Sequence, residues 1–267
     1  MQKQIPIKNI NKSLLALACG DSYGSCYESD GLIGCKFDID ELPNKPLNPM
    51  LTDDTKMATI LLRHYARHNK EINLNILLHE YMIWAKHDGL IDGIGLHTAS
   101  VLMQRKEDKN SQGNGALMRV VPFGLQLIDD GHSFNDACES MNQDSFLTHE
   151  NSTIAMANRV ALDLAMRGVE CLKKPEYKEF LYFLHLGNTA WVLHTLYIVI
   201  KTLKQSMTFL EGFKYIVSYG GDTDTNCAVY GAIRGYRESI DEELTLDDFL
   251  TPEMAVSLVS YKNDIIN

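Results

Sequence analysis

The sequence predicts an all-α protein that forms a single domain over residues 1–267. Apolar residues recur at the i, i+3, i+4 spacing of amphipathic helices along most of the chain, whereas the alternation that is typical of β-strands is almost absent. No composition shift, repeat or low-complexity linker divides the chain. With 267 residues, of which 45% are hydrophobic and 22% charged, it is long enough to bury a large core without disulfides or a structural metal.

The predicted helices are placed by their apolar faces. A first helix ends at a break around Gly20-Asp21-Ser22-Tyr23-Gly24, where two glycines interrupt the pattern. The apolar residues after Thr52-Asp53-Asp54 recur at helical spacing as far as Tyr65. Residues 31–50, with three prolines, form one long irregular connection, and such a loop inside a domain is usually functional. Further helices are predicted over residues 76–84, 154–166, 191–203, 209–217 and 228–236.

The charge of the chain excludes some classes of partner. Asp and Glu number 35 against 25 Lys and Arg, a formal net charge of −10, and no basic run is longer than Lys173-Lys174. Affinity for nucleic acids and anionic membranes depends on clustered Lys and Arg, so we expect neither as a partner.

The cysteines and the hydropathy of the chain bear on its compartment. The six cysteines show neither CxxC pairs nor neighbouring histidines at zinc spacing, so we expect reduced, mostly buried thiols. The apolar stretch among the first residues is too short for a secretory signal. No apolar stretch in the sequence is long enough to span a membrane. We therefore expect a monomeric, cytoplasmic protein.

Two acidic clusters, each directly before a helical pattern, are the strongest candidates for chemistry. The first is Thr52-Asp53-Asp54, and the second is Gly220-Gly221-Asp222-Thr223-Asp224-Thr225. Either could simply cap its helix, because hydroxyl and carboxylate oxygens accept the first backbone N–H groups and acids suit the positive end of the helix dipole. The second cluster has more oxygens than a cap needs, after a double glycine that allows a tight turn. Oxygen-rich, sulfur-free clusters suit the hard cations Mg²⁺ and Mn²⁺.

Three familiar motifs do not account for the second cluster. An EF-hand counted from Asp222 would need Gly and Glu where the sequence has Cys227 and Ile233. The Asp-x-Asp pair of haloacid dehalogenases follows a buried strand, and the Asp-x-Asp site of glycosyltransferases usually lies in an α/β fold. This sequence offers no such run of strands.

Three further features are weak when taken alone. Ser111-Gln112-Gly113-Asn114-Gly115 precedes a helix and is either a phosphate-binding loop or a plain glycine-rich turn. Glu28 follows the first glycine break, where a lone acid is usually solvated. His149 lies near a predicted helix start, where an ordinary surface histidine is common.

Together these pieces resemble the ADP-ribosylglycohydrolase family. The matching stretches occur in the order of the family and span most of the chain: LACGDSYGSCYE (17–28), TDDTKMA (52–58), SQGNGALMRVVPFG (111–124), Thr148-His149 and GGDTDTNCAVYGAIRG (220–235). The resemblance implies a compact, orthogonal all-α fold with two divalent metals, Mg²⁺ or Mn²⁺, in a central cleft. The implied metal ligands are Thr52, Asp53, Asp54, Asp222, Asp224 and Thr225.

The resemblance also implies roles for other residues. Glu28 matches a glutamate beside the metals, and Glu28 or Asp53 would relay protons. Ser111, Gly113, Asn114 and Gly115 match the loop that holds the diphosphate of ADP-ribose, and His149 matches a histidine near the same ligand. Arginine-specific members commonly carry the pattern Asp-x-Gly-x-x-Thr, whose aspartate lies near the substrate, and Asp92 is the candidate for it here. The chain departs from the pattern, because Asp92 stands one residue early in Asp92-Gly93-Ile94-Gly95-Leu96-His97-Thr98.

The resemblance therefore predicts a hydrolase that removes ADP-ribose from a modified protein or another ADP-ribose conjugate by cleaving the bond at C1″ of the ribose. Arginine is slightly favoured as the acceptor, although the position of Asp92 weakens that choice. The alternative is a catalytically silent relative that binds ADP-ribose or blocks a transferase.

Overall fold

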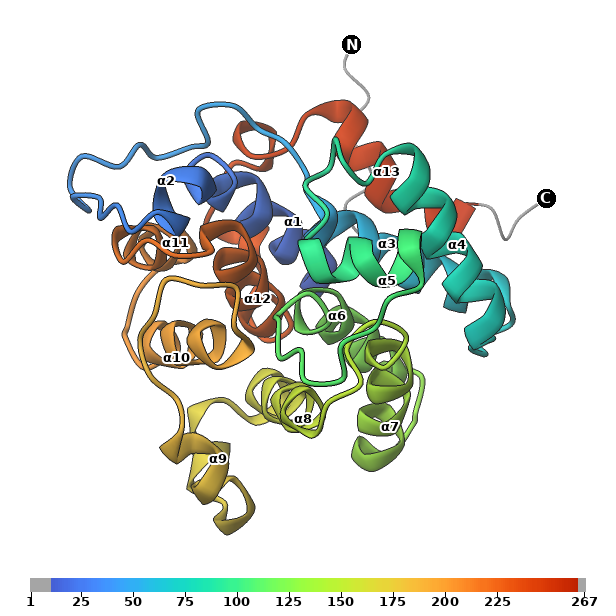
Figure 1. Ribbon diagram of the computed structural model, residues 1–267. Helices are drawn as coiled ribbons and strands as arrows, with labels where there is room; N and C mark the ends of the chain where they lie inside the picture. The colour runs from blue at the N-terminus through green and yellow to red at the C-terminus, as the bar shows by residue number, and fades with distance from the viewer. Residues whose placement is uncertain (1–10, 264–267) are drawn as a thin grey trace.

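A computed structural model describes residues 11–263, and this part of the protein is all-α, as predicted (Figure 1). Across the described residues the only β-type pairing is an isolated bridge between Gly113 and Trp191. The α-helices are α1 (Lys12–Gly24), α2 (Glu28–Leu32), α3 (Asp53–Arg67), α4 (Leu74–His87), α5 (Leu96–Gln104), α6 (Leu117–Asp129), α7 (Phe134–Ser145), α8 (Ser152–Arg167), α9 (Lys178–Tyr182), α10 (Val192–Leu203), α11 (Phe209–Ser218), α12 (Thr223–Gly235) and α13 (Pro252–Asn263).

Helices α1 and α12 form the centre of the fold, although they come from opposite ends of the chain (Figure 1). Their backbones touch at glycines. A Cβ atom added at Gly20 would lie 2.2 Å from the carbonyl oxygen of Cys227, and one added at Gly231 would lie 2.1 Å from that of Ala16. Only glycine allows two helices to approach this closely.

This contact corrects the predicted break at Gly20-Asp21-Ser22-Tyr23-Gly24. Helix α1 continues through the whole stretch, and every residue from Ser13 to Gly24 is buried. Gly20 and Gly24 are therefore packing positions against α12, since a Cβ atom at Gly24 would lie 2.3 Å from the Thr223 carbonyl oxygen. As a consequence, Asp21 is carried on a helix into the interior.

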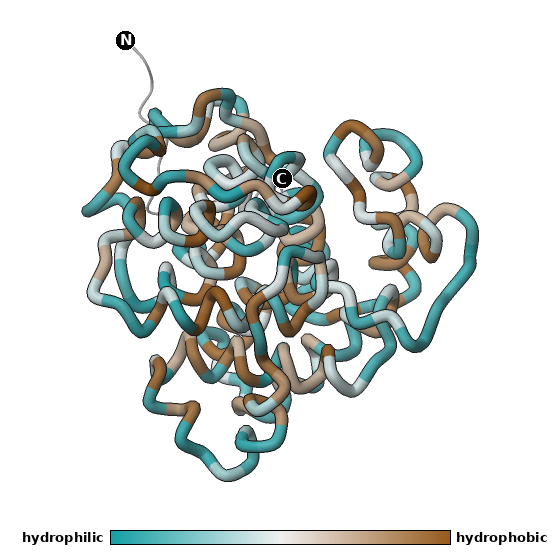
Figure 2. Tube along the Cα trace, turned by 60° about the vertical axis from the view of Figure 1, so that its left-hand side comes forward, coloured by the Kyte–Doolittle hydropathy of each residue, from teal (hydrophilic) through white to brown (hydrophobic). Residues whose placement is uncertain are grey.

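The other helices surround this pair. Helix α3 packs on α6, α6 packs on α7 and α8, and α10 and α11 pack on α12. Hydrophobic residues recur along the helices, whereas many of the outer turns are hydrophilic (Figure 2). The shared core includes Leu17, Met57, Phe123 and Phe213, each of them fully buried. Burial of such side chains stabilises the fold by about 1.5–3 kcal/mol each.

The structure confirms most of the predicted elements. The predicted helices over 76–84, 154–166, 191–203 and 209–217 correspond to α4, α8, α10 and α11, whereas α12 begins earlier than predicted, at Thr223. The irregular segment 31–50 is confirmed except for its first two residues, which end α2. All six cysteines are free, and Cys19, Cys138, Cys171 and Cys227 are buried. The start of the chain, where we expect no secretory signal, lies outside the described residues.

None of the helices in the described part of the chain is both long and apolar enough to cross a membrane.

Candidate active site

Asp21 ties the central helix α1 to the start of α3. Its carboxylate is fully buried and accepts hydrogen bonds from the backbone N–H groups of Thr52 (3.0 Å) and Thr55 (3.3 Å) and from both threonine hydroxyls. Burial raises the pKa of Asp21 to about 6, although these hydrogen bonds oppose the shift. Asp21 thus holds the start of α3, which carries Asp53 and Asp54, in place.

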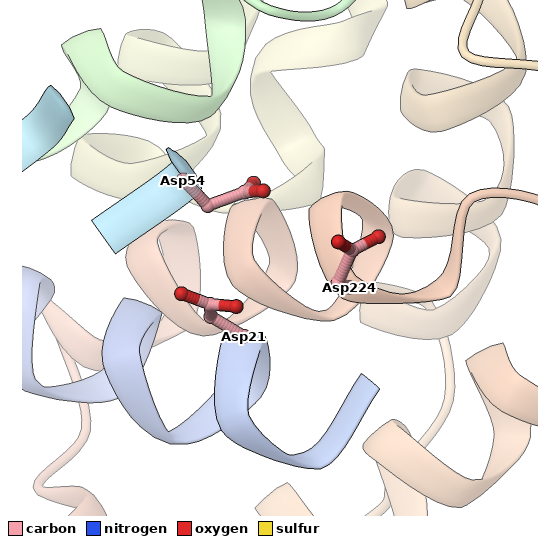
Figure 3. Close-up of side chains that lie close together, drawn as sticks. All are labelled: Asp21, Asp54 and Asp224. Atoms are coloured by element: carbon pink, nitrogen blue, oxygen red, sulfur yellow. The ribbon is translucent and has the colours of Figure 1, made fainter. Parts of the chain in front are cut away.

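Asp54 on α3 and Asp224 on α12 point with Asp21 into one space between three helices (Figure 3). One carboxylate oxygen from each of the three lies within 4.8 Å of the others. Asp54 Oδ2 accepts hydrogen bonds from the hydroxyls of Thr52 (3.2 Å) and Thr225 (3.3 Å). The Oδ1 atoms of Asp54 and Asp224 are buried and have no hydrogen-bond partner. A cation could satisfy two buried acceptors in this state.

A second group of acids shares Asp224 with the first. Oxygens of Glu28, Asp222 and Asp224 also lie within 4.8 Å of one another. Burial, together with the charges of Asp222 and Asp21, raises the pKa of Glu28 to about 7. Burial and neighbouring carboxylates likewise hold the pKa values of Asp54 and Asp224 well above the usual range. Asp53 belongs to neither group, but burial and the charges of Asp21, Asp222 and Glu28 raise its pKa. We call the set Asp21, Glu28, Asp53, Asp54, Asp222 and Asp224 the acid cluster.

The helix-capping explanation fails for both sequence clusters. Thr52 and Asp222 occupy the N-cap positions of α3 and α12, but neither side chain makes a capping hydrogen bond. The hydroxyl of Thr52 is directed to Asp21 Oδ1 at 2.8 Å, and Asp222 Oδ2 accepts a hydrogen bond of 2.8 Å from Asn114 Nδ2. The oxygens therefore converge on the cluster instead of on the helix ends, and an all-oxygen donor set of this kind fits Mg²⁺ or Mn²⁺.

The loop Ser111-Gln112-Gly113-Asn114-Gly115, here called the glycine loop, lies beside the acid cluster. Its backbone pairs with the segment before α10, where Asn114 N donates to Ala190 O and Val192 N donates to Gln112 O. The buried side chain of Asn114 donates to both Asp222 and Thr195. Asn114 therefore connects the glycine loop directly to the acids.

His149 packs under the glycine loop. Its ring is so close that a Cβ atom at Gly115 would lie 3.1 Å from His149 Cε1, and one at Gly113 would lie 3.3 Å from Nε2. Burial, with the charges of Arg119 and His97, holds the pKa of His149 well below its usual value. Arg119 in turn forms a fully buried ion pair with Asp144 and donates to the carbonyl oxygen of Gly115. His149 is therefore a buried, neutral ring that shapes the loop.

Comparison with known proteins decides the family. The family model described as ADP-ribosylglycohydrolase matches residues 3–243. The chain belongs to the ADP-ribosylglycohydrolase family. Proteins of this family are hydrolases that act on ADP-ribosyl linkages, and this chain is one of them.

Individual relatives agree with this assignment. The chain is 25% identical to a protein of Acanthamoeba polyphaga mimivirus named as an ADP-ribosyl glycohydrolase, over 88% of each chain. It is 23% identical to the ADP-ribosyl-dinitrogen reductase glycohydrolase of Rhodospirillum rubrum, over 86% of this chain and 85% of that protein. Among solved structures, an ADP-ribosylglycohydrolase-related protein complex matches the fold with a TM-score of 0.67 at 21% identity, over 96% of this chain and 99% of the other.

In this ADP-ribosylglycohydrolase, Asp53 and Asp92 meet through their backbones. Asp53 N donates to Asp92 O at 2.7 Å, and Gly95 N donates to Asp53 Oδ2 at 3.2 Å. The Asp92 carboxylate itself accepts a hydrogen bond of 2.8 Å from Trp84 Nε1 and lies 3.9 Å from Lys56 Nζ. Asp92 thus anchors the loop before α5 to α4, and its predicted contact with substrate stays a prediction.

Sequence reasoning missed one member of the acid cluster in this ADP-ribosylglycohydrolase, Asp21. The interpretation of Gly20 and Gly24 as a helix break concealed it, because an acid in a turn is usually solvated. The available signal was its position on a strongly apolar helix, since Leu14, Leu15, Leu17 and Tyr23 bury the same segment. A lone acid within such a helix is expensive to bury and is therefore a candidate for function.

Proposed function

We propose that this chain removes ADP-ribose from a modified protein side chain by hydrolysing the bond between C1″ of the ribose and the acceptor atom. One observation carries the proposal. Asp224 belongs to two groups of converging carboxylates, and Asn114 joins those groups to the glycine loop. A site for a sugar with adjacent hydroxyls and a site for its phosphates would thereby share one cleft.

Two divalent cations, Mg²⁺ or Mn²⁺, would be held by the carboxylates of Asp53, Asp54, Asp222 and Asp224 with the hydroxyls of Thr52 and Thr225. The two unpartnered, buried oxygens of Asp54 and Asp224 support this assignment. When bound, such cations supply the positive charge that orients ribose hydroxyls and polarises water. Asp21 would keep Thr52 and Thr55 in place through its four hydrogen bonds.

Glu28 would be the proton-transfer group, with Asp53 as the alternative. A carboxyl group with a pKa of about 7 is divided between its protonated and ionised forms near neutral pH. It can therefore accept a proton from the attacking water or donate one to the leaving atom. Glu28 begins α2 and lies beside Asp222 and Asp224, so its carboxyl group is within reach of the same bond.

The glycine loop would bind the diphosphate. It leads directly into α6, and backbone N–H groups at a helix start favour phosphate. Gly113 and Gly115 leave room for the His149 ring to pack against the loop backbone, which supports the loop from the side of His149. Ser111 would add a hydroxyl at the loop entrance.

A panel of substrates tests the proposal. Protein loaded with Mg²⁺ or Mn²⁺ is incubated with ADP-ribosylated arginine, ADP-ribosylated serine, poly(ADP-ribose), O-acetyl-ADP-ribose and ADP-ribosylated nucleic acid. The release of free ADP-ribose is measured. We expect cleavage of at least one linkage, abolition by EDTA, and at least a hundredfold lower turnover for Glu28→Gln with ADP-ribose affinity retained. Binding of ADP-ribose without cleavage of any conjugate would support the silent-binder alternative.

The proposal extends to the setting in which the protein acts. We further propose a monomer in the cytoplasm that acts on protein conjugates and not on nucleic acid or membranes; the net charge of −10 supports the exclusion of these polyanionic partners. Arginine is the first acceptor to test.

A further inference from the structure

Three of the most exposed apolar side chains in the described part of the chain lie within one short stretch, whose backbone is hydrogen-bonded to Asp53. Leu90, Ile91 and Leu96 expose 78%, 78% and 93% of their surface. They belong to the connection between α4 and α5 together with the first residue of α5, residues 88–96, here called the apolar rim. Scattered exposed leucines are ordinary, but three within seven residues form a concentrated feature that marks an interaction site.

The apolar rim is an ordered structure and not a loose loop. Gly89 N and Ile94 N donate hydrogen bonds to Trp84 O and Gly89 O, and Ile91 N donates to Asp88 O. The Trp84 indole holds the Asp92 carboxylate from inside, and Ile94 is buried. In the rim, the side chain of Ile94 is therefore buried, whereas those of Leu90, Ile91 and Leu96 are exposed on an ordered backbone.

The rim borders the acid cluster through direct hydrogen bonds. Asp92 O and Gly95 N bind the backbone and the carboxylate of Asp53. On its outer side the rim is open, because a Cβ atom at Gly93 or Gly95 would meet no atom within 4 Å. A carrier attached to a group bound at the acid cluster can therefore lie against this open, apolar edge.

We infer, on the basis of the function proposed above, that the apolar rim recognises the protein part of the substrate, by packing Leu90, Ile91 and Leu96 against an apolar segment beside the modified residue. The ADP-ribosyl group itself is bound deeper, among carboxylates and the glycine loop. The rim thus gives the protein a preference for ADP-ribosylated proteins over free ADP-ribosyl amino acids. Apolar anchors next to a polar site commonly carry such recognition.

The experiment compares one linkage on two carriers. A folded protein that carries the linkage cleaved by the wild type, and the free ADP-ribosyl amino acid with the same linkage, are hydrolysed by the wild type and by the triple variant Leu90→Ser, Ile91→Ser, Leu96→Ser. Val256→Ser on α13, also at an exposed apolar position, is the control. We expect kcat/KM on the protein substrate to fall about tenfold or more in the triple variant, with kcat/KM on the free amino acid conjugate unchanged and the control unaffected.

The outcomes separate the two proposals. A wild type that cleaves neither carrier contradicts the proposed function. If the wild type cleaves both carriers and the triple variant loses activity equally on both, the rim acts only through Asp53, and recognition of the protein by the rim is disproved. If the triple variant keeps full activity on both carriers, recognition of the protein by the rim is disproved as well. Sedimentation that shows a wild-type dimer and a monomeric triple variant would assign the rim to a second copy of the chain instead.

Discussion

The Oδ1 atoms of Asp54 and Asp224 carry the sharpest chemical signal among the single residues. Each is a buried acceptor without a hydrogen bond, beside other carboxylates that repel it. Leaving such a group unsatisfied costs about 1–3 kcal/mol. A bound cation would supply the missing partner and offset the repulsion among the carboxylates.

Asp224→Asn tests this directly. Because asparagine keeps the shape but removes one buried charge, we expect the variant to melt at a higher temperature than the wild type in EDTA. Wild-type protein should gain about 2.7 kcal/mol when Mg²⁺ is present at a hundred times its dissociation constant, and the variant should gain almost nothing. Thermal unfolding in EDTA and over a Mg²⁺ titration measures both effects. Asp247→Asn, at an exposed position, is the control; an equal Mg²⁺ response in both variants would place the cation elsewhere.

The site residues differ in how well the sequence predicts them. Thr52, Asp53, Asp54, Asp222, Asp224 and Thr225 stand in dense polar runs beside glycines or helix starts, so their type and spacing reveal them. Asp21 is hidden because its function depends on which helix covers it, a tertiary fact. For the same reason the sequence predicts that Asp92 lies near the site but does not predict the direction of its carboxylate. That direction is set by contacts with Trp84 and Lys56.

At the scale of elements, Asp163 joins the end of α8 to the short 3₁₀ helices Val169–Lys173 and Pro175–Tyr177. Its buried carboxylate accepts hydrogen bonds from Lys174, Tyr177 and Arg167. Burial raises the pKa of Asp163, but these hydrogen bonds outweigh it and the pKa lies below the usual value. Asp163 therefore stabilises this corner in its ionised form.

The sign of the pH dependence follows from that lowered pKa. The contribution of Asp163 is fully present above the pKa of an unfolded aspartate, about 3.9, and is lost as the pH falls through the folded pKa. We expect Asp163→Asn to lower the free energy of unfolding at pH 7 by about 1–3 kcal/mol, and the difference from wild type to shrink towards pH 3. Urea unfolding at pH 7, 5 and 3 measures this. A difference that stays constant with pH would show that packing, and not charge, is lost.

The contact between α1 and α12 predicts that a glycine-to-alanine substitution destabilises the protein, the opposite of its usual effect inside a helix. Alanine in place of glycine inside a helix normally stabilises it by about 1 kcal/mol. At Gly231 the added Cβ atom would collide with backbone at 2.1 Å, so we expect Gly231→Ala to destabilise the protein by about 1–3 kcal/mol or more. Gly95→Ala, whose Cβ atom meets nothing within 4 Å, should change stability little. Urea unfolding of both variants decides, and a stabilised Gly231→Ala would mean that the helices lie further apart.

For the whole molecule, the net charge predicts that the protein does not bind nucleic acids. With a net charge of −10 we expect no binding to single- or double-stranded oligonucleotides that weakens with added salt. Fluorescence anisotropy of labelled DNA and RNA at 50 and 200 mM salt, with ADP-ribose as the positive control, measures this. Tight binding that falls steeply with salt would reveal a basic surface that composition conceals.

The fold as a whole is predictable in kind but not in arrangement. Apolar spacing identifies α3, α4, α8, α10 and α11 one at a time, because each helix records its own buried face. The pairing of α1 with α12 leaves no comparable local pattern. It depends on Gly20, Gly24 and Gly231 meeting backbone from the other end of the chain, and glycines in isolation are typical of turns.

The central pairing also sets the order of events during synthesis. Helix α1 leaves the ribosome before α12, so the backbone that packs against Gly20 and Gly24 is absent until α12 has been made. Until then Leu14, Leu17 and Tyr23 lack the partner that covers them, and Asp21 lacks Asp224. A nascent chain with so long-range a central contact cannot complete its core co-translationally in stages. Helix α1 therefore lacks its main packing partner until α12 has been synthesised.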